Sequence, residues 1–473
     1  MSRPAGFLDW RNLLRECARE LGLDIDHEHD LIAVAQYYLN HRNRDRNHRN
    51  RDRARLNRIL KNEFDRPGTF SRNHEIIGGL PITTVWTTNF DKLLEKAFER
   101  AGRQLDVKWK DSQIPLAAEG REVTLYKMHG DIASPDEVII CKDDYERYAR
   151  QHELFQNQLA ADLVNKTLLF LGFSFTDPHL DYMLGHLRSL LEDSKREHFA
   201  VMRKTRLNTH NKDRVKARKV FEYELNKQAL QIEDLQRYSI HTHLIDSFDD
   251  VTGILEEIES RYYLRNIFVS GSAHEFGDFG EDRARDLCMH LGERLMAEDY
   301  RLISGMGLKV GDYLVKGALL KLYETGTPAV ENHLTLRPFP RNLPAEVNEG
   351  EFNAKYRRDM IAKCGFAIFI AGTSRSHLES EGVLQEYEIA KALKKIPIPI
   401  GATGFAARRI WEMMKPEIAD IYGDAVPART FKQLNEPGLT NEQLLNVVFE
   451  IIRRVSESAP DRATSTRARA AGR

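Results

Sequence analysis

Apolar strands that end in polar residues and run directly into helices are the feature that most constrains how this chain folds. The segment TTVWTTNFDKLLEKA at 83–97 is typical of a strand that ends near Asn89, with Asp91 at a plausible N-cap of the next helix. The segment LYKMHGDI at 125–132 is typical of a strand that leads to His129. Because open α/β sheets bind ligands at the carboxyl ends of their strands, both segments predict polar groups at a crevice.

A third segment, TLLFLGFSFTDPHLDYML at 167–184, repeats this arrangement. Its apolar strand is followed by Gly172, Ser174 and Asp177, and then by a helical pattern. Three such strand ends in one half of the chain predict a single crevice of nucleotide size.

Alternating strands and helices predict an α/β fold along most of the chain. In the first half this alternation implies a mostly parallel sheet with right-handed crossovers, and a second α/β unit begins near residue 264. The predicted fold class is α/β, with two Rossmann-like parallel-sheet domains in tandem. The expected strands of the first domain are 82–88, 123–128, 138–141, 167–172, 198–202 and 240–245. In the second domain, strands followed by turns are expected at 266–273, 366–374 and 396–404. A strand, a glycine-rich loop and a helix are expected at 300–319, and a further helix at 382–393.

Length and composition narrow the class of protein. With 473 residues and a mass of 54.6 kDa, the chain exceeds one ordinary core and predicts two domains. Its 70 Lys and Arg residues balance 71 Asp and Glu residues, so nothing draws it globally to nucleic acid or anionic membrane. No apolar run approaches the roughly 20 residues that span a bilayer, and the N-terminus lacks a signal-peptide pattern. Four scattered cysteines without a CxxC pair argue against a zinc site or a disulfide framework and favour a reduced, cytoplasmic protein.

Two charged segments interrupt the pattern, and a third ends it. The run HRNRDRNHRNRDRARL at 41–56 suits a nucleic-acid or phosphate arm, but interspersed aspartates and missing aromatics favour a solvated loop or helix extension. The stretch 203–238 predicts one or two solvated helices. The small, basic, aperiodic tail at 457–473 is expected to be disordered. We place the two domains at 1–262 and 263–456.

Asn89 and His129 are the candidate catalytic residues of the first domain. The Asn89 amide offers a donor and an acceptor, which suits it to orient a water or a hydroxyl group. An imidazole can act as a base or a hydrogen-bond partner, which suits His129 to handle a ribose hydroxyl. The alternative for His129 is a histidine that caps a strand end. For Asp91, Asp131 and Asp177 the favoured interpretation is a helix cap or loop brace.

Glycines between strands and helices are candidate phosphate ligands in the second domain. Gly305, Gly307 and Gly311 lie between a strand and a helix, and Gly271 and Ser272 repeat the arrangement one strand earlier. Glycine allows close backbone approach, and a helix N-terminus offers N–H groups to a phosphate. One such loop fits a structural turn equally well, but two at parallel strand ends favour nucleotide binding.

Two arginines and a glutamate complete this candidate nucleotide site. Arg357 and Arg358 are expected to open the helix before the next strand, where a guanidinium grips a phosphate through two hydrogen bonds. Glu386 is expected to open a helix that faces the same loops and to accept hydrogen bonds from ribose hydroxyls. The alternatives are a surface ion pair of the arginines with Asp359 or Glu351, and a solvated position for Glu386.

At this point the motifs resemble a known family. TTNFD, KMHGD and LGFSFTDPHLDY resemble the sirtuin-like NAD-consuming domains of bacterial anti-phage systems. VSGSA, ISGMGLKVG and KYRRDMI resemble a SLOG domain, a nucleotide-sensing relative of the lonely-guy phosphoribohydrolases. A sirtuin-like domain followed by a SLOG domain is the architecture of the effectors of Thoeris defence, and the resemblance covers roughly residues 8 to 455.

This resemblance implies an NAD+ hydrolase that releases nicotinamide and ADP-ribose and needs no cofactor, since NAD+ is its substrate. It implies that a TIR-domain partner makes a cyclic ADP-ribose isomer, which binds the SLOG domain as activator. NAD+ depletion then stops the infected cell. No nucleic-acid or membrane partner is implied.

Activation by a ligand also leads us to expect a homo-oligomer. Moving an enzyme from 1% to 99% active needs about 5.5 kcal/mol of differential binding. Symmetric subunits share that demand, and we expect a tetramer.

The resemblance assigns roles residue by residue. Asn89 and His129 match the catalytic Asn and His. The residues matched to effector binding are Gly271, Ser272, Gly305, Gly307, Gly311, Arg357 and Glu386. Those expected to bind NAD+ are Thr88, Asp91, Gly172, Ser174 and Asp177.

Three departures from the family pattern modify these expectations. The family usually begins with a strand and a GAGxS loop for the NAD pyrophosphate, whereas Met1 stands where that loop should just have ended, with Pro4-Ala5-Gly6 as a remnant. We therefore expect weak NAD binding by this chain. The missing four-cysteine zinc module argues against lysine deacylation. The loop AGTSRSHLESEG replaces the PGGxGT-type loop and Glu of phosphoribohydrolases, which favours binding over hydrolysis in the second half.

Two other classes of function stay open. One is a phosphoribohydrolase-type enzyme that acts through Arg357 and Glu386 and releases a nucleobase instead of nicotinamide. The other is a catalytically inert nucleotide-binding scaffold, which a turnover assay with and without cyclic ADP-ribose isomers would identify.

Overall fold

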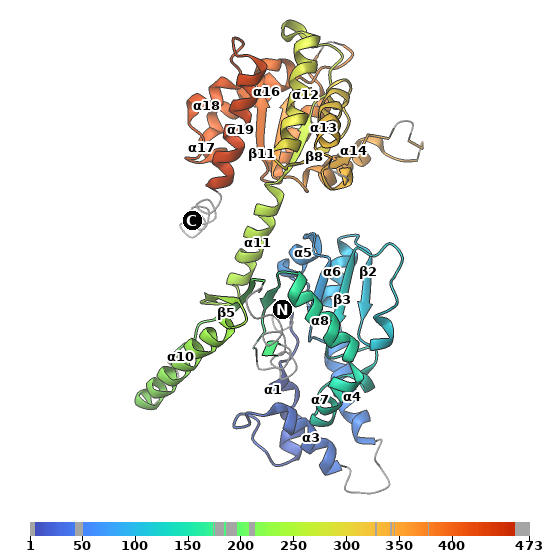
Figure 1. Ribbon diagram of the computed structural model, residues 1–473, viewed down its shortest axis with the longest axis vertical. Coiled ribbons are helices and arrows are strands. Elements are labelled where there is room, and N and C mark those ends of the chain that lie inside the picture. Colours follow the sequence, from blue (N-terminus) through green and yellow to red (C-terminus); the bar gives the residue numbers. More distant parts are fainter. Residues whose placement is uncertain are drawn as a thin grey trace. The chain divides into compact units, whose positions relative to one another are not determined.

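Every strand pairing in the described sheets is parallel, as the alternation of strands and helices predicts (Figure 1). In this computed structural model the chain divides into two units, Met1–Glu256 and Glu257–Arg473. The structure describes residues 5–42, 51–173, 175, 184–185, 196–207, 213–326, 329–340, 343–344, 346–376 and 378–458.

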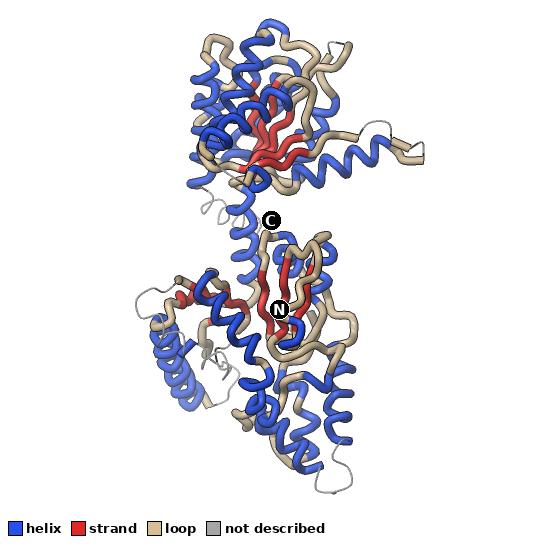
Figure 2. Tube along the Cα trace, turned by 45° about the vertical axis from the view of Figure 1, so that its right-hand side comes forward, coloured by secondary structure: helices blue, strands red, loops and turns tan. Residues whose placement is uncertain are grey.

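The strands of the first unit form two three-stranded sheets instead of the expected single sheet (Figure 2). The strand order is β1-β3-β2 in one sheet and β4-β5-β6 in the other. Side chains from both sheets, among them Trp86 of β1 and Phe170 of β4, join one apolar cluster. The sequence predicts one continuous hydrogen-bonded sheet, whereas apolar side-chain packing connects the two sheets of the structure. The bounds are β1 Thr84–Thr87, β2 Leu105–Lys108, β3 Val123–Lys127, β4 Leu169–Leu171, β5 His198–Arg203 and β6 Ile240–Ile245.

Strand β2 is absent from the sequence prediction because two of its four residues are charged. Asp106 and Lys108 are nevertheless buried and form an ion pair of 3.0 Å. The Lys108 ammonium also donates a hydrogen bond of 2.8 Å to the backbone carbonyl of Gln113. Pairing compensates for burial of these charges, which a pattern of apolar residues cannot reveal.

The strand predicted at 138–141 is wrong, although three apolar residues there are buried. The Arg53 guanidinium donates a hydrogen bond of 2.5 Å to the Val138 carbonyl. The Asp144 carboxylate accepts two more, each of 3.1 Å, from backbone N–H groups of this segment. Side chains thus satisfy backbone groups that a sheet partner would otherwise satisfy.

Helices make up the rest of the first unit. The described ends of the arginine-rich run 41–56 belong to α3 and α4, while 43–50 lie outside the described residues. The solvated helix predicted within 203–238 is confirmed as α10. The helices are α1 Trp10–Leu13, α2 Arg15–Glu20, α3 Leu31–Arg42, α4 Arg51–Phe64, α5 Arg72–Gly79, α6 Leu93–Arg100, α7 Lys142–Gln151, α8 Glu153–Asn165, α10 Arg214–Gln236 and α11 Asp250–Tyr263, which spans the division between the units.

The second unit contains a five-stranded parallel sheet with the strand order β11-β10-β7-β8-β9. The chain starts at the central strand β7, moves outward through β8 and β9, and returns to the other side as β10 and β11. The connections therefore reverse direction between β7 and β10, where open α/β sheets bind ligands. The short strand β9 is not predicted, because two of its three residues are exposed. The bounds are β7 Asn266–Ser270, β8 Arg301–Ser304, β9 Leu334–Leu336, β10 Phe366–Ile370 and β11 Ile396–Ile400.

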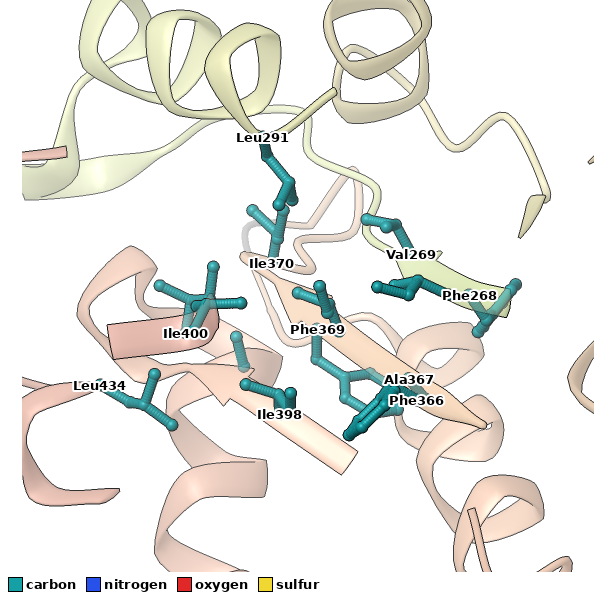
Figure 3. Close-up of a cluster of buried hydrophobic side chains, with 14 of the residues drawn as sticks. Phe268, Val269, Leu291, Phe366, Ala367, Phe369, Ile370, Ile398, Ile400 and Leu434 are labelled. Carbon is teal, nitrogen blue, oxygen red and sulfur yellow. The ribbon is translucent and has the colours of Figure 1, made fainter. Parts of the chain in front are cut away.

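The core of the second unit lies on both faces of this sheet (Figure 3). Every residue of β7 and β10 is buried, which explains their nearly uninterrupted apolar sequences. Helix α12 packs on α13 and α19, and α15 packs on α14 and α16. The helices are α12 Glu281–Ala297, α13 Val310–Glu324, α14 Glu349–Ile361, α15 Glu381–Ala392, α16 Phe405–Met414, α17 Ile418–Tyr422, α18 Ala428–Gln433 and α19 Asn441–Glu457.

Two further sequence predictions concern membrane-spanning helices and the C-terminal tail. Within the described ranges, no helix combines the length and apolar character that crossing a bilayer requires. Of the tail predicted to be disordered from residue 457, Glu457 ends α19, and 459–473 lie outside the described residues.

Two glycines allow α12 and α13 to approach closely. A Cβ atom at Gly292 would lie 2.1 Å from the carbonyl oxygen of Leu314, and one at Gly317 would lie 1.9 Å from that of Met289. Both contacts involve the backbone of the facing helix, which cannot yield as a side chain can. The crossing therefore requires glycine at both positions.

We predict that Gly292→Ala lowers the free energy of unfolding by about 3 kcal/mol, because the added methyl group forces the two helices apart. Urea denaturation followed by circular dichroism measures this change. The matched control is Gly350→Ala in α14, where the nearest side-chain atom would lie 3.4 Å away, and we expect no loss of stability there. Equal stability of the two variants would contradict the close crossing.

Candidate functional site

The register of two parallel strands brings Asn89 and His129 to the same edge of the first sheet. Thr87 of β1 lies opposite Lys127 of β3, and the Met128 N–H donates a hydrogen bond of 2.9 Å to the Thr87 carbonyl. Asn89 and His129 each lie two residues beyond that matched pair. Since neighbouring strands lie about 4.8 Å apart, the loops that carry these residues are adjacent.

A buried lysine connects the two loops. The Lys127 side chain is completely buried, and its ammonium contacts the carboxylates of Glu95 at 2.7 Å and Asp131 at 2.6 Å. It also donates hydrogen bonds to the carbonyls of Phe90, at 3.2 Å, and Asp91, at 2.8 Å. Burial raises the pKa of the Glu95 carboxyl, and Lys127 opposes that rise. One cation thus holds both strand-end loops and helix α6 together.

His129 lies in a closed environment next to these loops. It is buried, its ring meets the Tyr145 ring edge-on with centroids 5.7 Å apart, and its backbone carbonyl accepts a hydrogen bond of 2.9 Å from Ile139. The following Gly130 has φ near 90°, and a Cβ there would lie 3.0 Å from the Glu137 carbonyl oxygen. The tight turn after His129 therefore depends on glycine. Asn89 and Thr88 are only half-buried, so this edge is open on the side of β1.

The two described aspartates of the strand ends act as braces, as the sequence analysis favours. One Asp91 oxygen accepts a hydrogen bond of 3.0 Å from the Leu93 N–H, and Asp131 accepts one of 2.7 Å from Ala133. Helix α6 begins at Leu93 with Lys92 at the N-cap position, one residue later than predicted. The Asp91 carboxylate nonetheless caps the first turn.

The third predicted strand end is only partly described. Gly172 follows β4 with φ near 66°, as a glycine turn requires. Because β4 belongs to the other sheet, no strand register relates Gly172 to Asn89 and His129, and its role in NAD+ binding stays a prediction. Ser174 and Asp177 lie outside the described residues.

A pocket opens at the carboxyl ends of β7 and β8 in the second unit, beside the point where the connections reverse. Its volume is about 180 Å³. Among the predicted residues, those that line it are Gly271, Ser272, Gly305, Gly307, Arg357 and Glu386. This volume is smaller than the roughly 300–1,000 Å³ of typical small-molecule sites, so it matches a part of a nucleotide.

An ion pair occupies one side of this pocket. The Glu386 carboxylate accepts a hydrogen bond from the Ser270 hydroxyl and lies 3.4 Å from the Arg357 guanidinium. Burial raises the pKa of the Glu386 carboxyl, while Ser270 and Arg357 lower it. The Arg357 guanidinium also stacks 4.8 Å over the Phe339 ring and donates a hydrogen bond of 3.0 Å to Gln385.

Two predicted positions in this pocket are wrong in detail. Arg357 lies in the last turns of α14 and does not open the helix, and Glu386 lies in the middle of α15. Neither alternative interpretation holds for these two residues: Arg357 pairs with Glu386, and Glu386 is buried. Arg358 is exposed and does not line the pocket.

The glycines of the second unit shape the pocket floor by close backbone contact. A Cβ at Gly307 would lie 2.0 Å from the Gly271 carbonyl oxygen, and one at Gly271 would lie 2.7 Å from the Ile370 carbonyl oxygen. Gly311 does not line the pocket; it packs in the first turn of α13, where a Cβ would lie 2.7 Å from the Met306 Cα. Its role is helix packing in this structure.

Sequence reasoning missed several residues of both sites. Ser270, Phe339 and Gly382 line the pocket, and Lys127 and Glu95 join the strand-end loops. Ser270 stands directly before the Gly271 turn, and this position in the sequence could have identified it as a pocket residue. The others depend on chain reversals that no local pattern shows. No cluster of three His, Cys, Asp or Glu side chains able to hold a metal occurs among the residues that the structure describes.

We predict that Lys127→Met lowers the free energy of unfolding by about 3–5 kcal/mol, because two buried carboxyl groups lose their cation. Urea denaturation monitored by tryptophan fluorescence tests this. The control is Lys96→Met on the exposed side of α6, which should change stability by less than about 0.5 kcal/mol. A Lys127→Met protein as stable as the control would show that the cation does not hold the loops.

Comparisons with known proteins agree with the order of the two units. Residues 83–226 match the SIR2-like domain family, and residues 250–455 match the Sir2- and TIR-associating SLOG family. The defense-associated sirtuin 2 of Bacillus subtilis is 27% identical over 146 residues, which is 30% of this chain and 14% of that protein. That likeness concerns one part of each protein.

Two relatives match along nearly the whole chain. The NAD(+) hydrolase ThsA of Bacillus cereus (strain MSX-D12) is 36% identical over 457 residues, which covers 96% of this chain and 93% of the relative. The NAD(+) hydrolase ThsA of Acinetobacter baumannii (strain 532279) is 36% identical over 467 residues, with coverage of 96% and 94%. With the SIR2-like and SLOG matches in the same order, the chain belongs to the ThsA family of NAD(+) hydrolases.

Proposed function

We propose that the first unit hydrolyses NAD+ to nicotinamide and ADP-ribose at the edge that carries Asn89 and His129. The observation that carries this proposal is the register of β1 and β3, which sets both residues two positions beyond a matched pair. The relatives named as NAD(+) hydrolases support the reaction. NAD+ is the substrate, and the proposed step needs no cofactor.

The proposed chemistry is displacement at the anomeric carbon of the nicotinamide ribose. A water oxygen forms the new bond to this carbon, and nicotinamide leaves with the electron pair of the broken C–N bond. The Asn89 amide orients the water or a ribose hydroxyl. His129 accepts a hydrogen bond from a ribose hydroxyl, and this hydroxyl passes its proton to the imidazole as it takes up the proton released from water.

We predict that Asn89→Ala and His129→Ala each lower NAD+ turnover by about 10²–10⁴-fold, a barrier increase of ~3–5 kcal/mol, with the fold retained. The rate of nicotinamide release tests this prediction. Circular dichroism of each variant checks that the fold is retained. The control is His241→Ala in β6, where the side chain is half exposed and distant in sequence from the site. Turnover within a few-fold of the parent in both site variants would refute the assignment.

The second unit is proposed to be a nucleotide sensor for a cyclic ADP-ribose isomer made by a TIR-domain partner. The Arg357–Glu386 pair at the strand ends supports a site for phosphate and ribose groups. The match to a Sir2- and TIR-associating SLOG family supports the kind of partner. In this proposal the protein acts in the cytoplasm as a homo-oligomer, which we expect to be a tetramer. Its depletion of NAD+ protects the bacterium against phage.

The ion pair suggests how the sensor binds its ligand. A phosphate that approaches Arg357 competes with Glu386 for the guanidinium, which releases the carboxylate to accept a ribose hydroxyl. The pocket of about 180 Å³ must widen for a whole nucleotide. Ligand binding and rearrangement of the pocket are therefore the same event in this proposal.

We predict that Arg357→Ala and Glu386→Gln each weaken binding of cyclic ADP-ribose isomers by roughly 10–100-fold, since charge-assisted hydrogen bonds are lost. Calorimetric titration measures the affinity, and NAD+ turnover without effector should stay unchanged. Arg358→Ala and Glu388→Gln are matched controls, because both residues are exposed neighbours on the same helices. Parent affinity in both pocket variants would count decisively against the sensor.

One observation favours a second candidate function for this pocket. The raised pKa of the buried Glu386 carboxyl suits a general acid or base, as a phosphoribohydrolase requires. Incubation of the protein with nucleoside monophosphates separates the two functions. Release of a free nucleobase, lost in Glu386→Gln, would support hydrolysis, and an intact nucleotide would support sensing.

A further inference from the structure

Helix α10 is long and has few contacts with the described parts of its unit. It runs for 23 residues, about 34 Å, yet only Ala217 and Leu235 are buried. An isolated helix gains most of its stability from packing one apolar face. Here a second apolar face points away from the described core, since Val220, Tyr223 and Leu230 are 54%, 64% and 65% exposed.

Three of the exposed apolar residues, Val220, Tyr223 and Leu230, lie with three charged residues in one straight stripe, which we name the outer stripe. Its members follow the alternating spacing of four and three residues that keeps side chains on one face of a helix pair. All six members are exposed. The outer stripe consists of Lys216, Val220, Tyr223, Lys227, Leu230 and Asp234.

Asp213 at the N-cap and Arg237 at the C-cap favour the dipole of α10, whereas the charges of the turns inside these caps oppose it. The first turn holds no acidic residue, the last turn holds no basic one, and Arg214 and Lys216 begin the helix where its partial charge is positive. Glu233 and Asp234 stand in the last turn, where that charge is negative. Asp234 pairs only with Arg237, at the surface. A second helix in the opposite direction would bring the basic first turn of one copy beside the acidic last turn of the other.

We propose that the outer stripe of α10 binds the same stripe of a second copy of this chain, with the two helices antiparallel. A two-fold axis at the level of residue 225 brings Val220 opposite Leu230 of the second copy, and Tyr223 opposite Lys227. The apolar side chains then cover one another, and the lysine stem and ammonium lie over the tyrosine ring. Each contact occurs twice, as in any two-fold interface.

The same axis pairs the charged ends. Lys216 lies opposite Asp234 of the second copy, so the basic beginning of one helix meets the acidic end of the other. Neither contact involves a residue that the apolar core of the unit uses. The stripe is thus self-complementary in both apolar shape and charge, which favours a second copy over an unrelated partner.

This proposal specifies one contact of the homo-oligomer proposed above and is independent of NAD+ hydrolysis. A single helix pair covers less than the roughly 1,200–2,000 Å² of a standard interface. We therefore expect the α10 pair to contribute to assembly beside other contacts.

Disulfide trapping tests the pairing and its direction. A full-length Val220→Cys chain mixed with a Leu230→Cys chain should form a covalent mixed dimer under mild oxidation. Each variant alone should not, because its own two copies of the cysteine lie about 15 Å apart along the axis. The native cysteines are all buried, and burial raises the pKa of Cys17 and Cys141 to about 11, which keeps the background low.

Sedimentation of the full chain tests the contribution to assembly. The double variant Tyr223→Ser with Leu230→Ser should weaken self-association on the order of 100-fold, because each lost apolar contact is counted twice. The control is Val215→Ser with Leu225→Ser, which removes exposed apolar residues that lie off the stripe. Lys216→Glu or Asp234→Lys alone should weaken association about tenfold at low salt, and the combined charge swap should restore it.

Several results would overturn the proposal. They are a monomeric parent chain, equal assembly of the stripe variant and its control, or failure of the charge swap to restore association. Cross-linking of either single-cysteine variant with itself would reject the antiparallel direction, and a disulfide between the added cysteine and a native one of the same chain would show that the stripe packs within its own chain. Repeating the measurements on Asn89→Ala protein separates these outcomes from a failure of the hydrolase proposal, since that variant should assemble like the parent.

Discussion

One buried cation determines the geometry of the candidate active edge. Lys127 is completely buried, and its ammonium is shared between Glu95 and Asp131. Burial raises the pKa of the Glu95 carboxyl, and Lys127 opposes that rise. Because Lys127 also binds the carbonyls that follow Asn89, neither strand-end loop can shift without disturbing the other. Buried residues behind the two loops therefore fix the positions of Asn89 and His129.

The second unit uses a buried charge in a different way. Glu386 is also buried, but its cation is less tightly held, since Arg357 lies 3.4 Å away and reaches the pocket. Removal of the Lys127 ammonium would leave the carboxylates of Glu95 and Asp131 buried without a cation. A phosphate can replace Glu386 as partner of Arg357 without leaving the guanidinium unpaired. The first arrangement suits a fixed catalytic edge, and the second suits an exchangeable ligand site.

The sequence was informative where a local pattern coincides with the fold. Strand ends at Asn89, His129 and Gly271 followed from apolar runs that stop at polar or glycine residues, and the paired α/β units followed from their alternation. The sequence-based prediction of strands failed where a distant side chain takes the place of a neighbouring strand, as Arg53 does at 138–141. It failed also where charges are buried in pairs, as in β2. The Arg357–Glu386 pair joins residues 29 apart in sequence, so their mutual contact was invisible in either motif.

Two separate cores have a consequence for regulation. Each unit has its own cluster of buried apolar residues, as separate domains do. A ligand in the second unit influences chemistry in the first only if the two sites share a change of state that both favour. Self-association through α10, an element of the first unit, is one such change, because its equilibrium depends on every subunit of the assembly. An effector that favours the assembled state would then act on Asn89 and His129 without contact to either residue.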